Sequence, residues 1–161
     1  MRVSAKADYA VRAAAELAAA DEGPVKGERL AEAQDIPLQF LEHILLELKH
    51  HGIVRARRGA KGGYWLARPA EEVTIADVVR AVEGPIADVQ STPPEAIEYR
   101  GNSEHLREVW VAVRASLRSV LEEVTLANLV AGDLPPVVEE LTSQPDAWHA
   151  STSTKEMAEG R

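Results

Sequence analysis

Apolar residues in the first fifty positions recur every three or four residues, the spacing of helices that bury one face. They predict helices over 6–20, 27–34 and 37–50. Ser4 is an N-cap candidate for the first helix. Pro37 suits the first position of the third helix, where a missing N–H costs nothing. A short turn before Pro37 makes the second and third helices a predicted helix-turn-helix.

The pattern then changes to two short runs rich in β-branched and aromatic residues. Residues 53–58 and 64–67 are predicted strands, and the segment 59–63 between them is a glycine-rich turn. A hairpin directly after a helix-turn-helix is the layout of a winged helix-turn-helix domain. We therefore expect a DNA-binding domain over residues 1–85, with its wing at about 53–68.

Helical spacing returns after the hairpin. Thr74 begins a short helix with an imperfect capping box. Residues 86–101 show little periodicity and predict a mobile loop. The region 102–134 is expected to hold one long helix, because apolar residues repeat at threes and fours over 103–130. Residues 135–161 are a polar tail, which we expect to be disordered toward its end. The predicted fold class is mainly α with a small β hairpin.

Composition narrows the class of protein. The 161 residues suffice for one domain with an accessory element. No apolar run approaches the roughly 20 residues of a membrane span, and the polar start does not resemble a signal peptide, so we expect a soluble cytoplasmic protein. The chain has no cysteine, which excludes disulfides, thiolate catalysis and any cluster held by cysteines. His43, His50 and His51 lie close in sequence, but we predict no metal site.

The net charge of −8 argues against a nucleic-acid partner, but the distribution of charge reverses the argument. Residues 26–68 hold eight Lys or Arg and five Asp or Glu, a balance of +3. Residues 69–161 hold seven Lys or Arg and seventeen Asp or Glu, a balance of −10. Within the first of these regions, residues 53–68 contain five bases and no acid. Because phosphates respond to a local basic patch, the wing is the predicted DNA-binding surface.

The third helix is the predicted recognition helix, with its N-terminal residues in the major groove. Gln39 can pair with adenine, and Glu42 can accept from the cytosine amino group. Leu38 and Phe40 are equally explained as partly exposed packing residues. At the wing, glycines allow a close approach to DNA, and arginine suits the negative potential of a narrow minor groove. A solvated hairpin with ordinary surface charges is the alternative.

The predicted helix over 103–130 is too apolar to lie alone on a small domain. It packs either within its own chain or against a second copy, and two-fold dimers suit palindromic operators. The residues expected at a dimer interface are Leu106, Val109, Trp110, Val113, Leu117, Val120, Leu121 and Val124.

Five segments of the chain resemble a known family. They are 4–10 (SAKADYA), 40–45 (FLEHIL), 58–67 (RGAKGGYWLA), 74–79 (TIADVV) and 81–85 (AVEGP). Together they are similar to the BadM/Rrf family of winged-helix transcription regulators, and the resemblance covers roughly residues 1–130. The resemblance implies a homodimer, joined through its long C-terminal helix, that usually represses operons.

The resemblance also implies roles for single residues. Glu42 matches a recognition-helix position that contacts bases in the family's iron–sulfur cluster regulator, and Arg58 matches the wing arginine that enters the minor groove. Ser4, Lys6 and Tyr9 lie where the first helix can contact phosphates. The full set of candidate DNA-binding residues is Ser4, Lys6, Tyr9, Lys26, Leu38, Gln39, Phe40, Glu42, His43, Arg57, Arg58, Gly59, Lys61, Gly62, Gly63 and Tyr64.

Many members of the family sense iron, nitric oxide or redox state through a cluster. In those members three cysteines hold the cluster, and they lie in the stretch that corresponds to about 90–105 here. This chain has no cysteine. Asp8 matches an aspartate ligand of some members, but one carboxylate does not hold a cluster. We therefore expect no iron–sulfur cofactor and a small effector whose identity is unknown.

The loop with Pro93-Pro94 and the helix at 110–129 look like the family's cysteine-metabolism branch. That branch represses sulfur-assimilation genes and can respond through a complex with a cysteine biosynthetic enzyme. A small ligand between the loop and the dimer helix is equally compatible with the sequence.

Two other classes of function compete with a DNA-binding regulator. An enzyme is disfavoured because no spacing pairs a nucleophile with its base. The turn at 59–63 is not a phosphate loop, since no Gly-Lys-Ser/Thr follows and no helix begins there. A protein-interaction module would use the winged helix on a partner and no longer bind DNA. The acid-free wing argues against that hypothesis.

Overall fold

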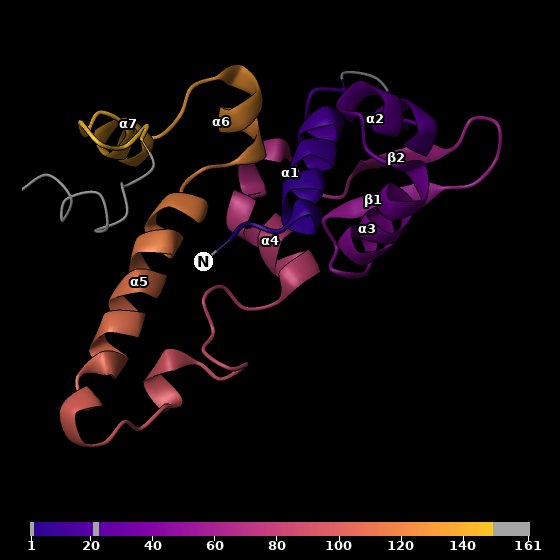
Figure 1. Cartoon of the computed structure of the whole chain (residues 1–161). Coiled ribbons are helices and arrows are strands. Elements are labelled where there is room, and N and C mark those ends of the chain that lie inside the picture. The colour runs from indigo at the N-terminus through magenta and orange to yellow at the C-terminus, as the bar shows by residue number, and fades with distance from the viewer. Residues whose placement is uncertain (1, 21–22, 150–161) are drawn as a thin grey trace, which may run out of the picture.

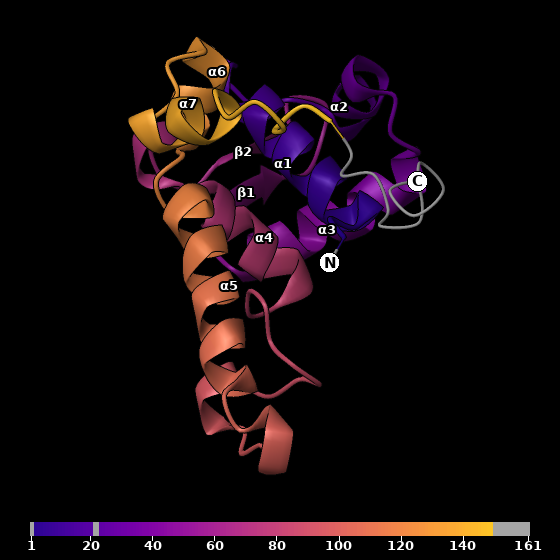
Figure 2. The same cartoon turned by 60° about the vertical axis from the view of Figure 1, so that its left-hand side comes forward.

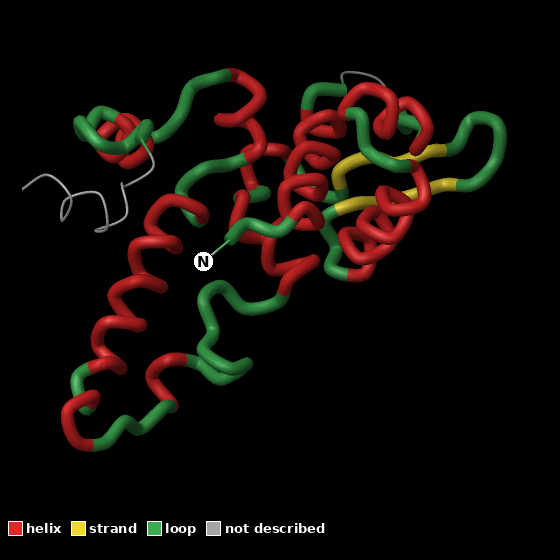
Figure 3. Tube along the Cα trace, in the orientation of Figure 1, coloured by secondary structure: helices red, strands yellow, loops and turns green. Residues whose placement is uncertain are grey.

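The computed structural model describes residues 2–20 and 23–149. A helical body carries a hairpin at one end, and a long helix stands out from the body as an arm (Figure 1, Figure 2). Helices and one hairpin account for its regular structure (Figure 3), which confirms the predicted fold class. The elements are α1 (Ala5–Ala18), α2 (Gly27–Gln34), α3 (Leu38–His50), β1 (Val54–Arg57), β2 (Gly63–Leu66), the 3₁₀ turn η1 (Ala70–Glu72), α4 (Ile75–Glu83), the 3₁₀ turns η2 (Pro94–Ala96) and η3 (Gly101–Ser103), α5 (Leu106–Leu121), α6 (Leu126–Ala131) and α7 (Pro136–Thr142).

Helix α1 runs through the centre of the body and is rich in alanine. Ala10, Ala13 and Ala14 have no exposed surface, and their small side chains let α3, α4 and α6 approach closely. The first turn of α4 is secured by a complete capping box between Thr74 and Asp77, which the sequence predicted only in imperfect form. Helix α3 adds its whole apolar face to the core through Leu41, Ile44, Leu45 and Leu48.

A tight backbone turn sets the angle between α2 and α3. Asp35 ends α2 with φ = 50°, the left-handed conformation common at helix ends. The amide of Ile36 then donates to the carbonyl of Ala31 at 2.9 Å, and the Ile36 side chain is buried. The predicted helix-turn-helix is therefore confirmed, and its second helix is α3.

The hairpin is tied to the helix-turn-helix as well as to α3. Strands β1 and β2 pair antiparallel, ending with Arg57 opposite Gly63. Val25 adds a short third rung, because its amide and carbonyl both bond to the backbone of Tyr64 at 2.8 Å. Glycine is required at 63, where φ is 148° and a Cβ would lie 2.5 Å from the Val25 carbonyl oxygen. The segment just before α2 therefore supports the wing.

The prediction of one long helix over 103–130 is wrong, because residues 122–125 divide it into α5 and α6. Thr125 begins α6 with a complete capping box, in which its side chain and that of Asn128 each bond to the other's backbone amide. The apolar spacing continues across the break, so periodicity alone could not reveal it.

The same break brings the chain back into the body. The amide of Ile75 donates to the carbonyl of Val124 at 2.9 Å, and the amide of Leu126 donates to the carbonyl of Val73 at 2.8 Å. Val124 is only 7% exposed, and Leu126 is fully buried. Val124, which the sequence placed at a dimer interface, is therefore a core residue of its own chain.

Between α4 and α5, the predicted loop at 86–101 contains the turn η2, which packs against α5 with Pro94 buried, and the turn η3 begins only at the last residue of that loop. Part of the predicted tail forms α7. Residues 150–161 lie outside the described residues, so the disorder expected there stays a prediction. Within the described part of the chain, no helix is both long and apolar enough to cross a membrane.

Candidate nucleic-acid interface

Helix α3 presents a polar face to solvent. Gln39, Glu42 and His43 are exposed near its start. Leu46 is 48% exposed and Lys49 is also exposed, and both lie on the helical stripe of Glu42 because they follow it by four and seven positions. Leu46 and Lys49 are not among the DNA-binding residues predicted from the sequence, although their spacing from Glu42 could have identified them.

Leu38 and Phe40 make packing contacts within the body. Leu38 is half-buried against the core. Phe40 is 40% exposed, and its ring meets that of Tyr9 edge to face with centroids 5.7 Å apart. The guanidinium carbon of Arg12 lies 5.3 Å from the Tyr9 ring centroid. The packing interpretation therefore applies to both residues, and a DNA contact by either stays a prediction.

Hydrogen bonds close the tip of the wing. The amide of Gly62 donates to the carbonyl of Gly59 at 3.0 Å, and the Arg57 guanidinium donates to the carbonyl of Lys61 at 2.9 Å. Gly62 is buried, and a Cβ there would overlap the Arg57 carbonyl oxygen. The turn therefore needs Gly62 for its own fold, and it presents Arg58 and Lys61 to solvent.

A hollow lies between α3 and the wing. Burial raises the pKa of the Tyr64 phenol in this hollow, and the carboxylates of Glu42 and Glu28 raise it further. Tyr64 therefore keeps its proton and can donate a hydrogen bond. The lining of the hollow includes Lys26, Glu42, Leu46, Lys49, Arg58 and Tyr64.

The first residues of α1 are engaged within the body. Ser4 caps α1 as predicted, and its hydroxyl also donates to the carboxylate of Glu83. The ammonium of Lys6 lies 2.8 Å from the carboxylate of Glu47 on α3. These partners are distant in sequence, so no local pattern could predict them. Phosphate contacts by the start of α1 stay a prediction.

The arm, defined as α5, is apolar but none of its side chains is buried in the described part of the chain. Val109 is 51% exposed, and the other predicted dimer contacts on α5 are partly exposed. An apolar surface of this kind is typical of an interface with another protein surface. The exposed face of α5 is thus the candidate dimer surface.

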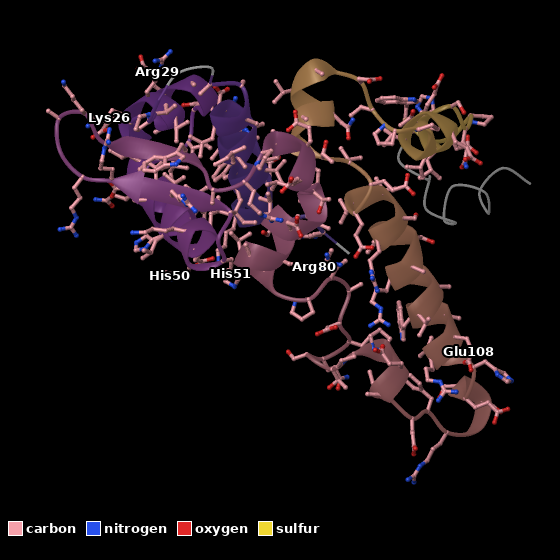
Figure 4. The ribbon with its side chains drawn as sticks, turned by 180° about the vertical axis from the view of Figure 1, so that it is seen from behind. Lys26, Arg29, His50, His51, Arg80 and Glu108 are labelled. Atoms are coloured by element: carbon pink, nitrogen blue, oxygen red, sulfur yellow. The ribbon has the colours of Figure 1, made fainter. Side chains whose placement is uncertain are left out.

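Ion pairs anchor the arm to the body. The carboxylate of Glu122 pairs with Arg80 of α4 and, at 2.8 Å, with Arg118 of α5. Hydrogen bonds from Arg80 and then Arg118 lower the pKa of Glu122. Arg114 lies 2.7 Å from Glu95 in η2. Figure 4 shows Arg80 on the side of the body that faces the arm.

A helix-turn-helix followed by a basic wing defines the class of winged-helix DNA-binding proteins. Residues 3–132 match the Rrf2 family, which is described as iron-dependent transcriptional regulators. The chain belongs to this family, as the resemblance predicted.

Curated relatives and solved structures agree with this assignment. The chain is 49% identical over 156 residues to the HTH-type transcriptional regulator Rv1287 of Mycobacterium tuberculosis, an alignment that covers 96% of this chain and 95% of the relative. The structure of CymR, the global cysteine regulator of B. subtilis, is 30% identical with a TM-score of 0.69, covering 82% of this chain and 98% of CymR. The structure of T. potens IscR is 32% identical with a TM-score of 0.67, and the match covers 82% of this chain and 88% of IscR. The protein is a DNA-binding transcriptional regulator and not an enzyme.

The family's description raises the question of whether this chain can hold iron. The chain has no cysteine, so the segment 86–101 offers no thiolate. Asp8, the one candidate ligand that the resemblance suggested, pairs with Arg12 at 3.1 Å. Among residues 2–20 and 23–149, no three His, Asp or Glu side chains are grouped for a metal ion. The residues present do not fit an iron–sulfur cluster.

Proposed function

We propose that this regulator is a homodimeric repressor that recognises a palindromic operator. The observation that carries the proposal is the arm, whose apolar side chains are not buried by the described part of their own chain. Pairing of two arms covers this surface and relates two winged helices by a two-fold axis. A palindromic operator has the same symmetry. Repression follows the usual behaviour of the family that the sequence resembles.

On each half-site, α3 lies in the major groove and the wing in the minor groove. Gln39 and Glu42 are exposed at the start of α3 and contact base edges there. Arg58 and Lys61 are exposed at the wing tip and meet the negative potential of the minor groove. The acidic remainder of the chain faces away from the phosphates and lowers non-specific binding.

The regulator works without an iron–sulfur cluster and acts in the bacterial cytoplasm, where chromosomal DNA lies. Its effector is a small ligand or an enzyme partner. The likeness to CymR, named as a global cysteine regulator, supports genes of sulfur or cysteine metabolism as its targets.

Selection from a random duplex library with the wild-type chain tests the proposed function. Footprinting of the enriched duplex should show two inverted half-sites. The double variant Arg58→Ala/Lys61→Ala should weaken binding and reduce the salt dependence by about two charges. A folded protein that enriches no sequence would contradict the operator proposal and favour the protein-interaction module.

Genome-wide mapping of bound sites tests the proposed pathway. Bound sites beside sulfur-assimilation genes support the cysteine-metabolism branch. Bound sites confined to other genes contradict it, without affecting the operator proposal.

A further inference from the structure

Lys26 lies at the junction between the helix-turn-helix and the wing. It is the residue before α2, and its ammonium donates to the carbonyl of Gly59 at the wing tip, with Nζ 2.6 Å from the oxygen. Figure 4 shows Lys26 beside the wing loop. The sequence placed Lys26 among the DNA-binding residues, but its charged group already has a partner within the chain.

The Gly59 carbonyl is the point at which the wing tip is held. It accepts one hydrogen bond from the amide of Gly62 at 3.0 Å and another from Lys26. A charged donor makes a stronger hydrogen bond to a carbonyl than a neutral donor does. Lys26 therefore reinforces the turn that presents Arg58 and Lys61 to solvent.

The base of the wing has other supports, but the tip extends beyond them. Val25 bonds to Tyr64 at the base, and the β1–β2 ladder ends at the pair of Arg57 and Gly63. Residues 58–62 project past this ladder. Among the hydrogen bonds of the described residues, the bond from Lys26 is the link between the helical body and this projecting segment.

We propose that Lys26 is a positioning residue, whose ammonium fixes the wing tip so that Arg58 and Lys61 meet the minor groove. Lys26 then acts on DNA through the wing and not through a phosphate of its own. This inference rests on the proposed function of the wing. A direct phosphate contact behaves differently, because its loss lowers the salt dependence of binding by about one charge whatever the state of the wing.

Trypsin cleavage of the folded chain without DNA tests the first half of the inference. Lys26→Met keeps the aliphatic stem and removes the donor. Lys49→Met is the matched control, because it removes a cation from the same hollow. Cleavage after Arg58 and Lys61 should be roughly tenfold faster in Lys26→Met, the factor expected for one lost hydrogen bond of this kind, and unchanged in Lys49→Met. Equal rates in wild type and both variants would overturn the inference.

Operator binding tests the second half, with the enriched duplex as the probe. Lys26→Met should weaken binding roughly fivefold to tenfold with an unchanged salt dependence. In the Arg58→Ala/Lys61→Ala background the same substitution should have little further effect, because coupled residues give non-additive losses. The inference would be overturned if the losses of operator affinity were additive and Lys26→Met lowered the salt dependence of binding by about one charge. That result would assign Lys26 to a direct phosphate contact. If the wild type enriches no duplex, the proposed function fails, while the trypsin result still decides whether Lys26 holds the tip.

Discussion

The body and the arm contain similar apolar residues but use them in opposite ways. In the body, side chains such as Ala13, Leu45 and Leu126 are fully buried within one chain. In the arm, the described structure buries none, even though most positions that face one side are Leu, Val or Trp. Burying apolar area stabilises by about 25 cal/mol per Å². The body is therefore complete in one chain, whereas the arm leaves apolar surface exposed for the second chain that we propose.

The largest effect is expected in the body. Leu45 lies in the middle of α3 with no exposed surface, so Leu45→Ala leaves a cavity and should lower the free energy of unfolding by about 2–5 kcal/mol. Its neighbour Leu46 is half-exposed, and Leu46→Ala should cost less than about 1 kcal/mol. Urea unfolding followed by circular dichroism compares the two. Equal losses would show that α3 does not pack as described.

In the arm, a new charge should separate the two chains of the proposed dimer without unfolding the body. Leu117→Asp should convert the dimer to a monomer and lower affinity for the enriched duplex about 100-fold, because the two half-sites are then bound independently. Ser119→Asp places the same charge on an exposed polar position of α5 and should change neither property. Sedimentation velocity measures the oligomeric state of each variant, and a DNA titration measures its affinity for the duplex. A Leu117→Asp protein that stays dimeric would contradict the assignment of the arm.

Two glycines of the wing offer a comparison within the body. Gly59 and Gly63 both have positive φ, but a Cβ at 59 enters open space, whereas one at 63 meets the Val25 backbone. Gly59→Ala should lower the free energy of unfolding by about 1 kcal/mol, because alanine is strained in this backbone conformation. Gly63→Ala should lower the free energy of unfolding by about 1 kcal/mol more, since the backbone pairing of Val25 with Tyr64 must also shift. Urea unfolding measures the loss of unfolding free energy in each variant. A larger loss in Gly59→Ala than in Gly63→Ala would contradict the close contact between Gly63 and Val25.

The smallest effect concerns the joint between the two regions. Because Arg80 and Arg118 lower the pKa of Glu122 in the folded state, ionised Glu122 stabilises the fold above its unfolded pKa. This contribution should be lost as the pH falls through the lower folded pKa. Glu122→Gln should therefore be slightly less stable than wild type at neutral pH, and the difference should vanish in acid. A difference that persists below the folded pKa of Glu122 would exclude its charge as the cause.

How well the sequence predicted the structure depends on whether the deciding interactions are local. Helices α1 to α4 and the hairpin follow from periodicity and from caps such as Ser4 and Thr74, which act within one turn. The division of α5 from α6 has a local signal in the capping box of Thr125 and Asn128, which the continuing apolar periodicity concealed. The backbone bonds that Val124 and Leu126 make with the distant segment 73–75 have no such local signal. The contact of Lys26 with the wing tip is hidden for the same reason, because its partner lies 33 positions away.

The same distinction applies to the candidate site. The exposed polar start of α3 and the basic wing tip could be predicted, since both rest on short motifs. The engagement of Lys6 with Glu47 and the packing of Phe40 on Tyr9 could not, since each joins elements that only the fold brings together.

The number of chains on one operator duplex shows whether the arm pairs two winged helices. Native mass spectrometry of the wild-type chain with the enriched duplex should show two chains per duplex, and a dimer when no DNA is present. One chain per duplex, with a monomer in the absence of DNA, would contradict the claim that the arm pairs two winged helices across a palindrome.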